Sequence, residues 1–216
     1  MVVQLSYRKS LRWVPGEPSE PTSTLVLDVG DFFVDLRMLK ADSTIDWAMA
    51  GRRTILSSSP LECQWTKEIC SQNTEAHDDI GIFEDLPNGD ALEKGSMPNP
   101  DNSDKIQDYE EVWGNLDIAP SEQPAWILRS KDGNGITFVG KVGSWFQVLR
   151  KSEGGEFAVL REEKVDGSWL RRYQVGEKLP SMAELGEEVF SAEGWKQDTD
   201  VKVGGVTYTV YALEKA

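Results

Sequence analysis

Three charged residues on two predicted strands have the types and spacing for acid–base chemistry. Asp35 and Arg37 alternate with apolar residues in 32–38 and so share one strand face, and Asp46 lies on the polar face of the next strand, 44–49. If these faces point inward, burial raises the carboxyl pKa while the guanidinium lowers it, which can produce an acid or base near neutral pH. If they point outward, the residues are ordinary cross-strand ion partners. Both remain open, and we take all three as candidate catalytic residues.

Aromatic residues provide a candidate ligand-binding wall. The chain has eight tryptophans, which either pack sheet cores or line a cup. An eight-stranded barrel is about wide enough to be filled by side chains or to hold one small ligand. The candidate ligand-binding residues are Phe33, Trp47, Trp65, Tyr109 and Trp113. Of these, Trp47 and Trp65 on successive predicted strands are preferred.

Tyr109 and Trp113 lie in an aromatic and acidic stretch, 109–113. This stretch fits a linker whose aromatic side chains dock on a barrel. The alternatives are a lid over a barrel mouth and a short motif that a protein partner recognises.

The motifs of metal and cofactor enzymes are missing from the sequence. The single histidine, His77, lies in a polar loop without further ligands at metal-site spacing, so we predict no metal. Cys63 and Cys70 lack the pattern of a disulfide framework or a zinc site and are expected to be thiols in a reducing compartment. No P-loop, nucleophile elbow or dinucleotide fingerprint occurs. Any enzyme here is expected to work without a cofactor.

The charge distribution bears on partners and location. The net charge is -14, and residues 78–122 hold thirteen acidic residues and two lysines. Phosphate backbones and anionic lipids would repel such a chain, so neither nucleic acid nor a membrane surface is expected as a partner. No apolar run is long enough to span a membrane, and no secretory leader is apparent. We expect a soluble cytoplasmic protein, with the nucleus as an alternative location.

The positioning elements are predicted to be short antiparallel strands with one helix. Alternation and turn residues indicate strands over 24–28, 32–38, 44–49, 62–67 and 80–84, and again over 125–130, 136–142, 144–150, 156–162, 168–175 and 206–213. Residues 181–190 predict a helix, with Ser181 as its cap and Glu184 completing a capping box. The pattern predicts an all-β protein.

A short internal repeat suggests duplication. The tetrapeptide Ala-Leu-Glu-Lys occurs at 91–94 and at 212–215, each time at the end of a strand array. We interpret these as terminal strands that close two barrels, since closure removes exposed sheet edges. The predicted domains are an N-terminal barrel (1–97), an acidic linker or lid (98–122) and a C-terminal barrel (123–216).

The order of several segments resembles the fungal HRI family of Hrr-interacting proteins. These segments include 22–27, 33–37, 45–51, 64–66, 87–90, 92–95 and 109–113, so the match is dense from Trp13 to Trp113. The resemblance implies two lipocalin-like (calycin-like) antiparallel barrels in tandem and a fungal intracellular protein. The one short helix predicted at 181–190 falls in the second barrel. It transfers no catalytic residue.

Two functions of different classes follow. One is a barrel that binds a hydrophobic or aromatic small molecule, extended by analogy to a cofactor-free cyclase or isomerase of fungal secondary, polyketide-type metabolism. The other is a non-enzymatic interaction protein in which the acidic linker or a barrel face docks a basic partner. An open cavity with Asp35 and Arg37 inside would favour the first, and packed interiors would favour the second. The oligomeric state is not fixed by the sequence, and a homodimer is one option.

Overall fold

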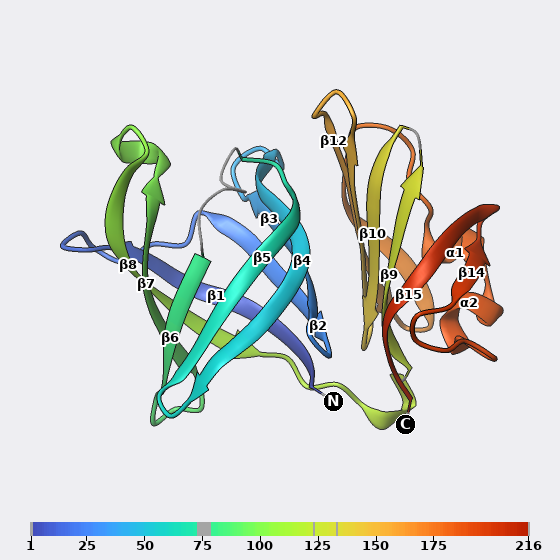
Figure 1. Cartoon of the computed structure of the whole chain (residues 1–216), viewed down its shortest axis with the longest axis horizontal. Coiled ribbons are helices and arrows are strands. Elements are labelled where there is room, and N and C mark those ends of the chain that lie inside the picture. The colour runs from blue at the N-terminus through green and yellow to red at the C-terminus, as the bar shows by residue number, and fades with distance from the viewer. Residues whose placement is uncertain (1, 73–78, 123, 133, 216) are drawn as a thin grey trace.

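The computed structural model describes residues 2–72, 79–122, 124–132 and 134–215. The first half forms a closed antiparallel barrel of eight strands in chain order (Figure 1). Its strands are β1 (Val3–Trp13), β2 (Thr22–Val29), β3 (Phe32–Leu39), β4 (Ile45–Ser58), β5 (Leu61–Cys70), β6 (Asp79–Asp85), β7 (Ala91–Asn99) and β8 (Lys105–Asn115). His77 lies outside the described residues.

The barrel closes through a segment that the sequence assigned to the linker. Strand β8 pairs with β7 on one side and with β1 on the other. Residues 98–122 are therefore not simply a linker between two barrels, and the repeated tetrapeptide at 91–94 begins β7 instead of closing the barrel. In β8, Tyr109 and Glu111 are buried while Glu110 lies on the other face. Acidic residues therefore occur on both faces of this strand, which concealed its alternation in the sequence.

The second half forms a seven-stranded sheet that is not closed, so the expectation of a second barrel is not confirmed. Its order is β13-β12-β11-β10-β9-β15-β14. These strands are β9 (Ala125–Asp132), β10 (Gly135–Val142), β11 (Trp145–Ser152), β12 (Phe157–Val165), β13 (Ser168–Val175), β14 (Asp200–Val203) and β15 (Val206–Glu214). The chain between the edge strands β13 and β14 forms helices, and Met182 and Val189 from them pack beside Trp126 and Phe146. Helical side chains thus fill the space that barrel closure would have enclosed.

The predicted helix at 181–190 is two short helices, α1 (Met182–Leu185) and α2 (Glu187–Ser191). Gly186 separates them with a φ of 78°, a left-handed value that glycine adopts without strain. Ser181 stands at the N-cap, but its side chain does not cap its own helix. Instead its hydroxyl donates to Glu162 Oε1 at 2.6 Å, and Glu162 Oε2 accepts from the Met182 amide at 2.8 Å. A strand carboxylate therefore replaces the predicted capping box.

The two halves pack through one apolar interface, which lies between the barrel and the open sheet in Figure 1. Leu27, Val34 and Leu36 on the outside of the barrel belong to one core cluster with Ile127 and Phe138 of the sheet. Because apolar side chains from β2 and β3 face outward here, the alternate residues of the same strands face the barrel interior.

Two buried polar side chains of the open sheet also bridge this interface. Gln147 Nε2 donates to the carbonyl of Val34 at 3.1 Å, and Arg161 Nη1 donates to the carbonyl of Ser23 at 3.1 Å. Arg161 also donates to Gln147 Oε1 at 2.7 Å. Buried backbone carbonyls need partners, so these contacts hold β2 and β3 in a defined position on the sheet.

Candidate functional site

The barrel interior contains a cavity of about 230 Å³. At one end its lining side chains are partly or fully exposed, among them Gln4, Leu61, Asp85 and Asn115. Toward the other end Trp47 and Tyr109 are buried. The cavity is therefore a cup that opens at the end of the barrel where β1 begins.

Aromatic side chains make up much of the cavity wall. Each of the five predicted ligand-binding residues lines it, together with one that was not predicted, Phe83. The set is Phe33, Trp47, Trp65, Phe83, Tyr109 and Trp113. Trp65 and Phe83 contact each other with ring centroids 5.8 Å apart, and these rings come from neighbouring strands. Such a wall suits a flat apolar or aromatic molecule.

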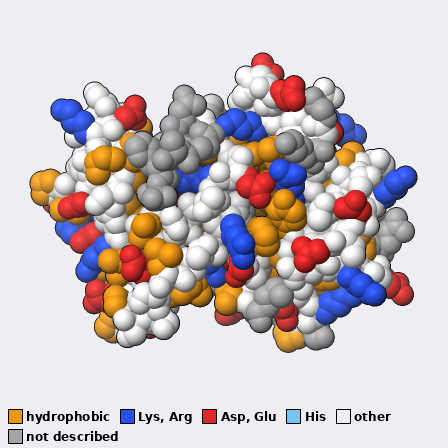
Figure 2. Space-filling model, viewed as in Figure 1, with side chains coloured by type: hydrophobic (Ala, Val, Ile, Leu, Met, Phe, Trp, Pro, Cys, Tyr) orange, Lys and Arg blue, Asp and Glu red, His pale blue; other side chains and the backbone are white. Residues whose placement is uncertain are grey.

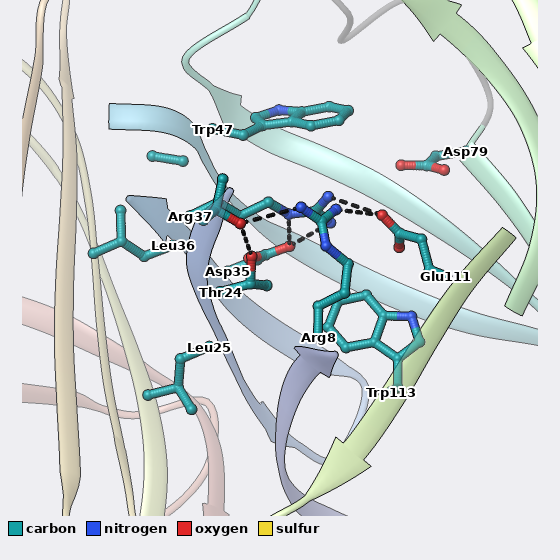
Figure 3. Close-up of polar contacts among 12 residues, drawn as sticks. Arg8, Thr24, Leu25, Asp35, Leu36, Arg37, Trp47, Asp79, Glu111 and Trp113 are labelled. Carbon is teal, nitrogen blue, oxygen red and sulfur yellow. Dashed lines mark hydrogen bonds and ion pairs between the residues drawn. The ribbon is translucent and has the colours of Figure 1, made fainter. Parts of the chain in front are cut away.

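Asp35 and Arg37 point inward and form a buried ion pair (Figure 3). Arg37 donates to Asp35 Oδ2 from Nε at 3.0 Å and from Nη2 at 2.8 Å. Its Nη1 donates to Glu111 Oε1 at 3.3 Å, and Arg8 donates to the same Glu111 oxygen. Two carboxylates thus neutralise Arg37, and two guanidiniums share Glu111.

The Arg37 guanidinium also lies among aromatic rings. Its carbon is 5.0 Å from the Trp47 ring centroid and 5.8 Å from that of Trp113. Lys67 Nζ lies 5.2 Å from the Trp47 centroid and pairs with Asp79 at 3.0 Å. These cation–π contacts orient the indole rings that a ligand would meet.

One oxygen of Asp35 has no partner within the described structure. Asp35 is 2% exposed, and its Oδ1 accepts no hydrogen bond although Oδ2 accepts two. Burial raises the pKa of this carboxyl and Arg37 opposes the shift. An unsatisfied buried oxygen is costly. Oδ1 is itself fully buried, so a donor on a bound molecule would reach it only after a neighbouring side chain shifts.

Glu93 is a second buried carboxyl in the cavity wall, and its position was not predicted from the sequence. Tyr109 Oη donates to its Oε1 at 2.7 Å, and Trp113 Nε1 donates to its Oε2 at 2.8 Å. Burial, followed by the charges of Glu111 and Asp79, raises the pKa of Glu93 to about 8. Glu93 is therefore largely protonated at neutral pH, and it can lose and regain its proton at a pH slightly above neutral.

Asp28 and Arg53 form a looser pair in the cavity wall. Arg53 Nη1 lies 3.7 Å from Asp28 Oδ1. Burial raises the pKa of Asp28 to about 6, with Arg53 acting against the shift.

Asp46 is separated from the other two predicted catalytic residues. It lies at a β-bulge, because β3 and β4 shift register between the Arg37–Trp47 and Met38–Ile45 pairs. It is half-buried and does not line the cavity. Burial raises the pKa of Asp46. Asp46 thus remains a predicted catalytic residue without a place in the cavity.

Three polar residues of the cavity wall or its ion pairs were not predicted as site residues from the sequence, namely Arg8, Glu93 and Glu111. Arg8 lies in β1, a strand that was not predicted, and Glu111 lies in the segment interpreted as a linker. Glu93 lies in the tetrapeptide at 91–94, which was interpreted as part of a barrel-closing strand and not as part of a site. A signal was available in 107–113, where Gln107, Tyr109, Glu111 and Trp113 alternate with the outward residues.

Neither a metal cluster nor a membrane-spanning helix is found in the part of the chain that the structure describes. No group of three or more His, Cys, Asp or Glu side chains is arranged to hold a metal ion there. No helix within those residues is long and apolar enough to cross a membrane. Cys63 and Cys70 are both buried thiols.

Comparison with known proteins gives a family and a fold. The family model described as Protein HRI1 matches residues 4–211. No curated protein matches the chain significantly. The crystal structure of an uncharacterized protein from Saccharomyces cerevisiae is similar with a TM-score of 0.79 and 17% identity, covering 99% of this chain and 100% of that one. At that identity the likeness establishes the fold alone.

Proposed function

The chain belongs to the HRI1 family, and we propose that its N-terminal barrel binds a small aromatic molecule in the cavity. The observation that carries the proposal is a cup of about 230 Å³ walled by aromatic rings, with inward-facing Asp35 and Arg37. An apolar cavity of roughly 150 Å³ is enough to hold benzene. A molecule of one or two rings therefore matches the space.

The polar groups define which aromatic molecules fit best. Asp35 Oδ1 lacks a partner in the described structure, so a hydroxyl or N–H on the ring system would satisfy it once the side chains that cover this oxygen shift. Arg37 already serves two carboxylates, Asp35 and Glu111, which leaves it little capacity to bind a further anion. The proposed ligand is accordingly a neutral aromatic molecule with a hydrogen-bond donor, such as a phenol or an indole.

A cofactor-free cyclase or isomerase is the enzymatic form of this proposal. A shaped apolar cup would hold one reactive conformer of an aromatic, polyketide-type substrate, and conformer selection alone can contribute several kcal/mol. Proton transfer would then need a carboxyl that titrates near neutral pH. Asp28 and Glu93, whose pKa values are raised to about 6 and about 8, are such groups in the cavity wall. The neutralised Arg37 is poorly placed to stabilise a developing phenolate.

The alternative of an interaction protein has less support. Glu93 and Glu111 from the acidic segment are buried in the barrel, and Asp79 pairs with Lys67. The exposed acids of the same segment, such as Asp85, Asp101 and Asp117, remain available to a partner. On the face shown in Figure 2, acidic and basic side chains are interspersed. This arrangement gives a basic partner no concentrated acidic surface on that face.

The proposal is tested by titrating the protein with 2-naphthol and following tryptophan fluorescence, with native mass spectrometry for stoichiometry. Val26→Phe adds a ring inside the cavity, and Ile106→Phe adds the same ring at a position that is 61% exposed on β8. We expect one molecule to bind the natural protein and the Ile106 variant, and binding to weaken at least tenfold in the Val26 variant. Equal binding by both variants, or none by the natural protein, would refute the proposal.

A further inference from the structure

Glu93 differs from the other buried carboxyls of the cavity in the charge of its partners. Its two hydrogen-bond donors, Tyr109 and Trp113, are neutral. Among the described residues, no lysine or arginine nitrogen forms an ion pair with it within 4.0 Å, whereas Asp35 and Glu111 are each paired with arginine. A carboxyl without a fixed counter-ion is free to gain and lose a proton.

The surrounding backbone makes room for this arrangement. A Cβ added to Gly81 would lie 2.5 Å from Glu93 Oε1, and one added to Gly95 would lie 2.6 Å from Tyr109 Oη. Each Glu93 oxygen accepts one hydrogen bond and keeps a further lone-pair position. Because Glu93 lines the cavity, a bound molecule can meet that position.

We propose that Glu93 is the proton-transferring residue of this barrel, and that it acts on a carbon-bound proton of an aromatic molecule held in the cavity. The inference rests on the proposed function. The Glu93 carboxylate would take a proton from an acidic carbon, and the C–H electron pair would move into the ring system. The protonated carboxyl would then return that proton to another carbon. This is an isomerisation, which balances without any oxidant, reductant or co-reactant.

The groups around Glu93 indicate the pH range for this step. Asp79 from β6 and Glu111 from β8 raise the pKa of Glu93, while the Tyr109 hydrogen bond from β8 and Arg37 from β3 lower it. Burial raises the pKa of Tyr109 well above its ordinary value of 10, so Tyr109 stays a hydrogen-bond donor throughout. The base form of Glu93 therefore appears as the pH rises through about 8.

A suitable probe is 5-nitrobenzisoxazole, a flat two-ring molecule that needs only a base. The base removes the proton on C3, the C–H electrons complete a nitrile, and the N–O bond breaks to leave a coloured phenolate. We expect a rate that follows one ionisation near pH 8. In Glu93→Gln we expect the rate to fall about 100-fold or more, because a general base typically accelerates a reaction by at least that factor. Glu84→Gln changes an exposed carboxyl on β6 and serves as the matched control, with an unchanged rate.

Binding is measured separately, with 5-nitroindole as an unreactive analogue that quenches tryptophan fluorescence. Analogue binding without a rate above that of Glu93→Gln would overturn the inference and leave the proposed function standing. No binding of either molecule would overturn both. Tyr109→Phe gives a second readout if Glu93→Gln fails to fold. It removes a hydrogen bond that lowers the Glu93 pKa, so the midpoint of the pH profile should rise, and an unmoved midpoint would contradict the assignment.

Discussion

Gly81 and Gly95 lie directly opposite each other across β6 and β7. The pair leaves the space in which Glu93 and Tyr109 meet, since a side chain at either glycine would collide with one of them. Two glycines in paired strand positions weaken a sheet locally, so their presence is best explained by the groups they accommodate.

Substitution of either glycine by alanine should therefore destabilise the barrel. Overpacking of this kind costs about 1–3 kcal/mol, which urea denaturation would detect. Gly154→Ala is the control, because its added Cβ would meet only a hydroxyl at 3.6 Å. A Cβ at Gly95 would also lie 2.7 Å from the Ile80 carbonyl oxygen. Equal stability of all three variants would therefore show that Glu93, Tyr109 and this backbone carbonyl can all move aside freely.

Loss of Arg37 should be far more damaging than loss of a surface arginine. Arg37→Met leaves Asp35 buried without its ion-pair partner, and breaking a buried pair costs about 3–5 kcal/mol. Arg52→Met breaks a pair in which both side chains are more than half exposed, and should cost less than about 1 kcal/mol. Both free energies of unfolding can be measured in urea.

A compensating substitution tests the reason for that cost. Adding Asp35→Leu to Arg37→Met removes the uncompensated carboxylate, so most of the lost stability should return. If the double variant is as unstable as Arg37→Met alone, the cost comes from packing around Arg37 and not from the buried charge.

The stability of the protein should fall between pH 6.5 and 8 because of Glu93. Its folded pKa is raised from 4.5 to about 8, so in this window the folded protein holds a proton that the unfolded chain has lost. The free energy of unfolding therefore decreases as the pH rises, by up to about 1.4 kcal/mol per pH unit, and levels off above 8. Glu93→Gln should remove this slope.

Two other titratable groups, Asp28 and Lys141, contribute mainly outside the window from pH 6.5 to 8. The raised pKa of Asp28, about 6, confines its similar contribution to lower pH. Burial lowers the pKa of Lys141 to about 8, so its contribution increases stability as the pH rises above 8. The pKa of Asp35 is also raised by burial, so the Glu93 contribution is the difference between the slopes of the natural protein and Glu93→Gln from pH 6.5 to 8. A slope that persists in Glu93→Gln would assign the effect elsewhere.

Much of the strand pattern was predictable from the sequence, because β2 to β6 and most strands of the second sheet alternate clearly or are bounded by turn residues. The face of each strand that points into the barrel could not be predicted from the sequence. Asp35 and Arg37 alternate with Val34 and Leu36, and only the packing of those apolar residues on a second sheet turns the charged face inward. That information lies in residues about 90 or more positions away in the chain, beginning with Ala125 and Ile127.

The errors have related physical causes. Strand β8 was interpreted as linker because its acidic residues resemble a solvated segment, although Glu111 is neutralised by Arg8 and Arg37. The second barrel was expected from two similar strand arrays, the repeated tetrapeptide and the family resemblance. None of these reveals that helical residues from between β13 and β14 pack on the sheet. Glu93 carries no local motif, and its environment arises from Tyr109 and Trp113 on the neighbouring strand.

The most direct test is a crystal structure of the protein with 2-naphthol bound. The account predicts the rings inside the barrel, among Trp47, Trp65 and Trp113, with the hydroxyl within hydrogen-bond distance of Asp35 Oδ1. Naphthol bound only on the outer surface, with the cavity filled by water or by rearranged side chains, would contradict the central claim.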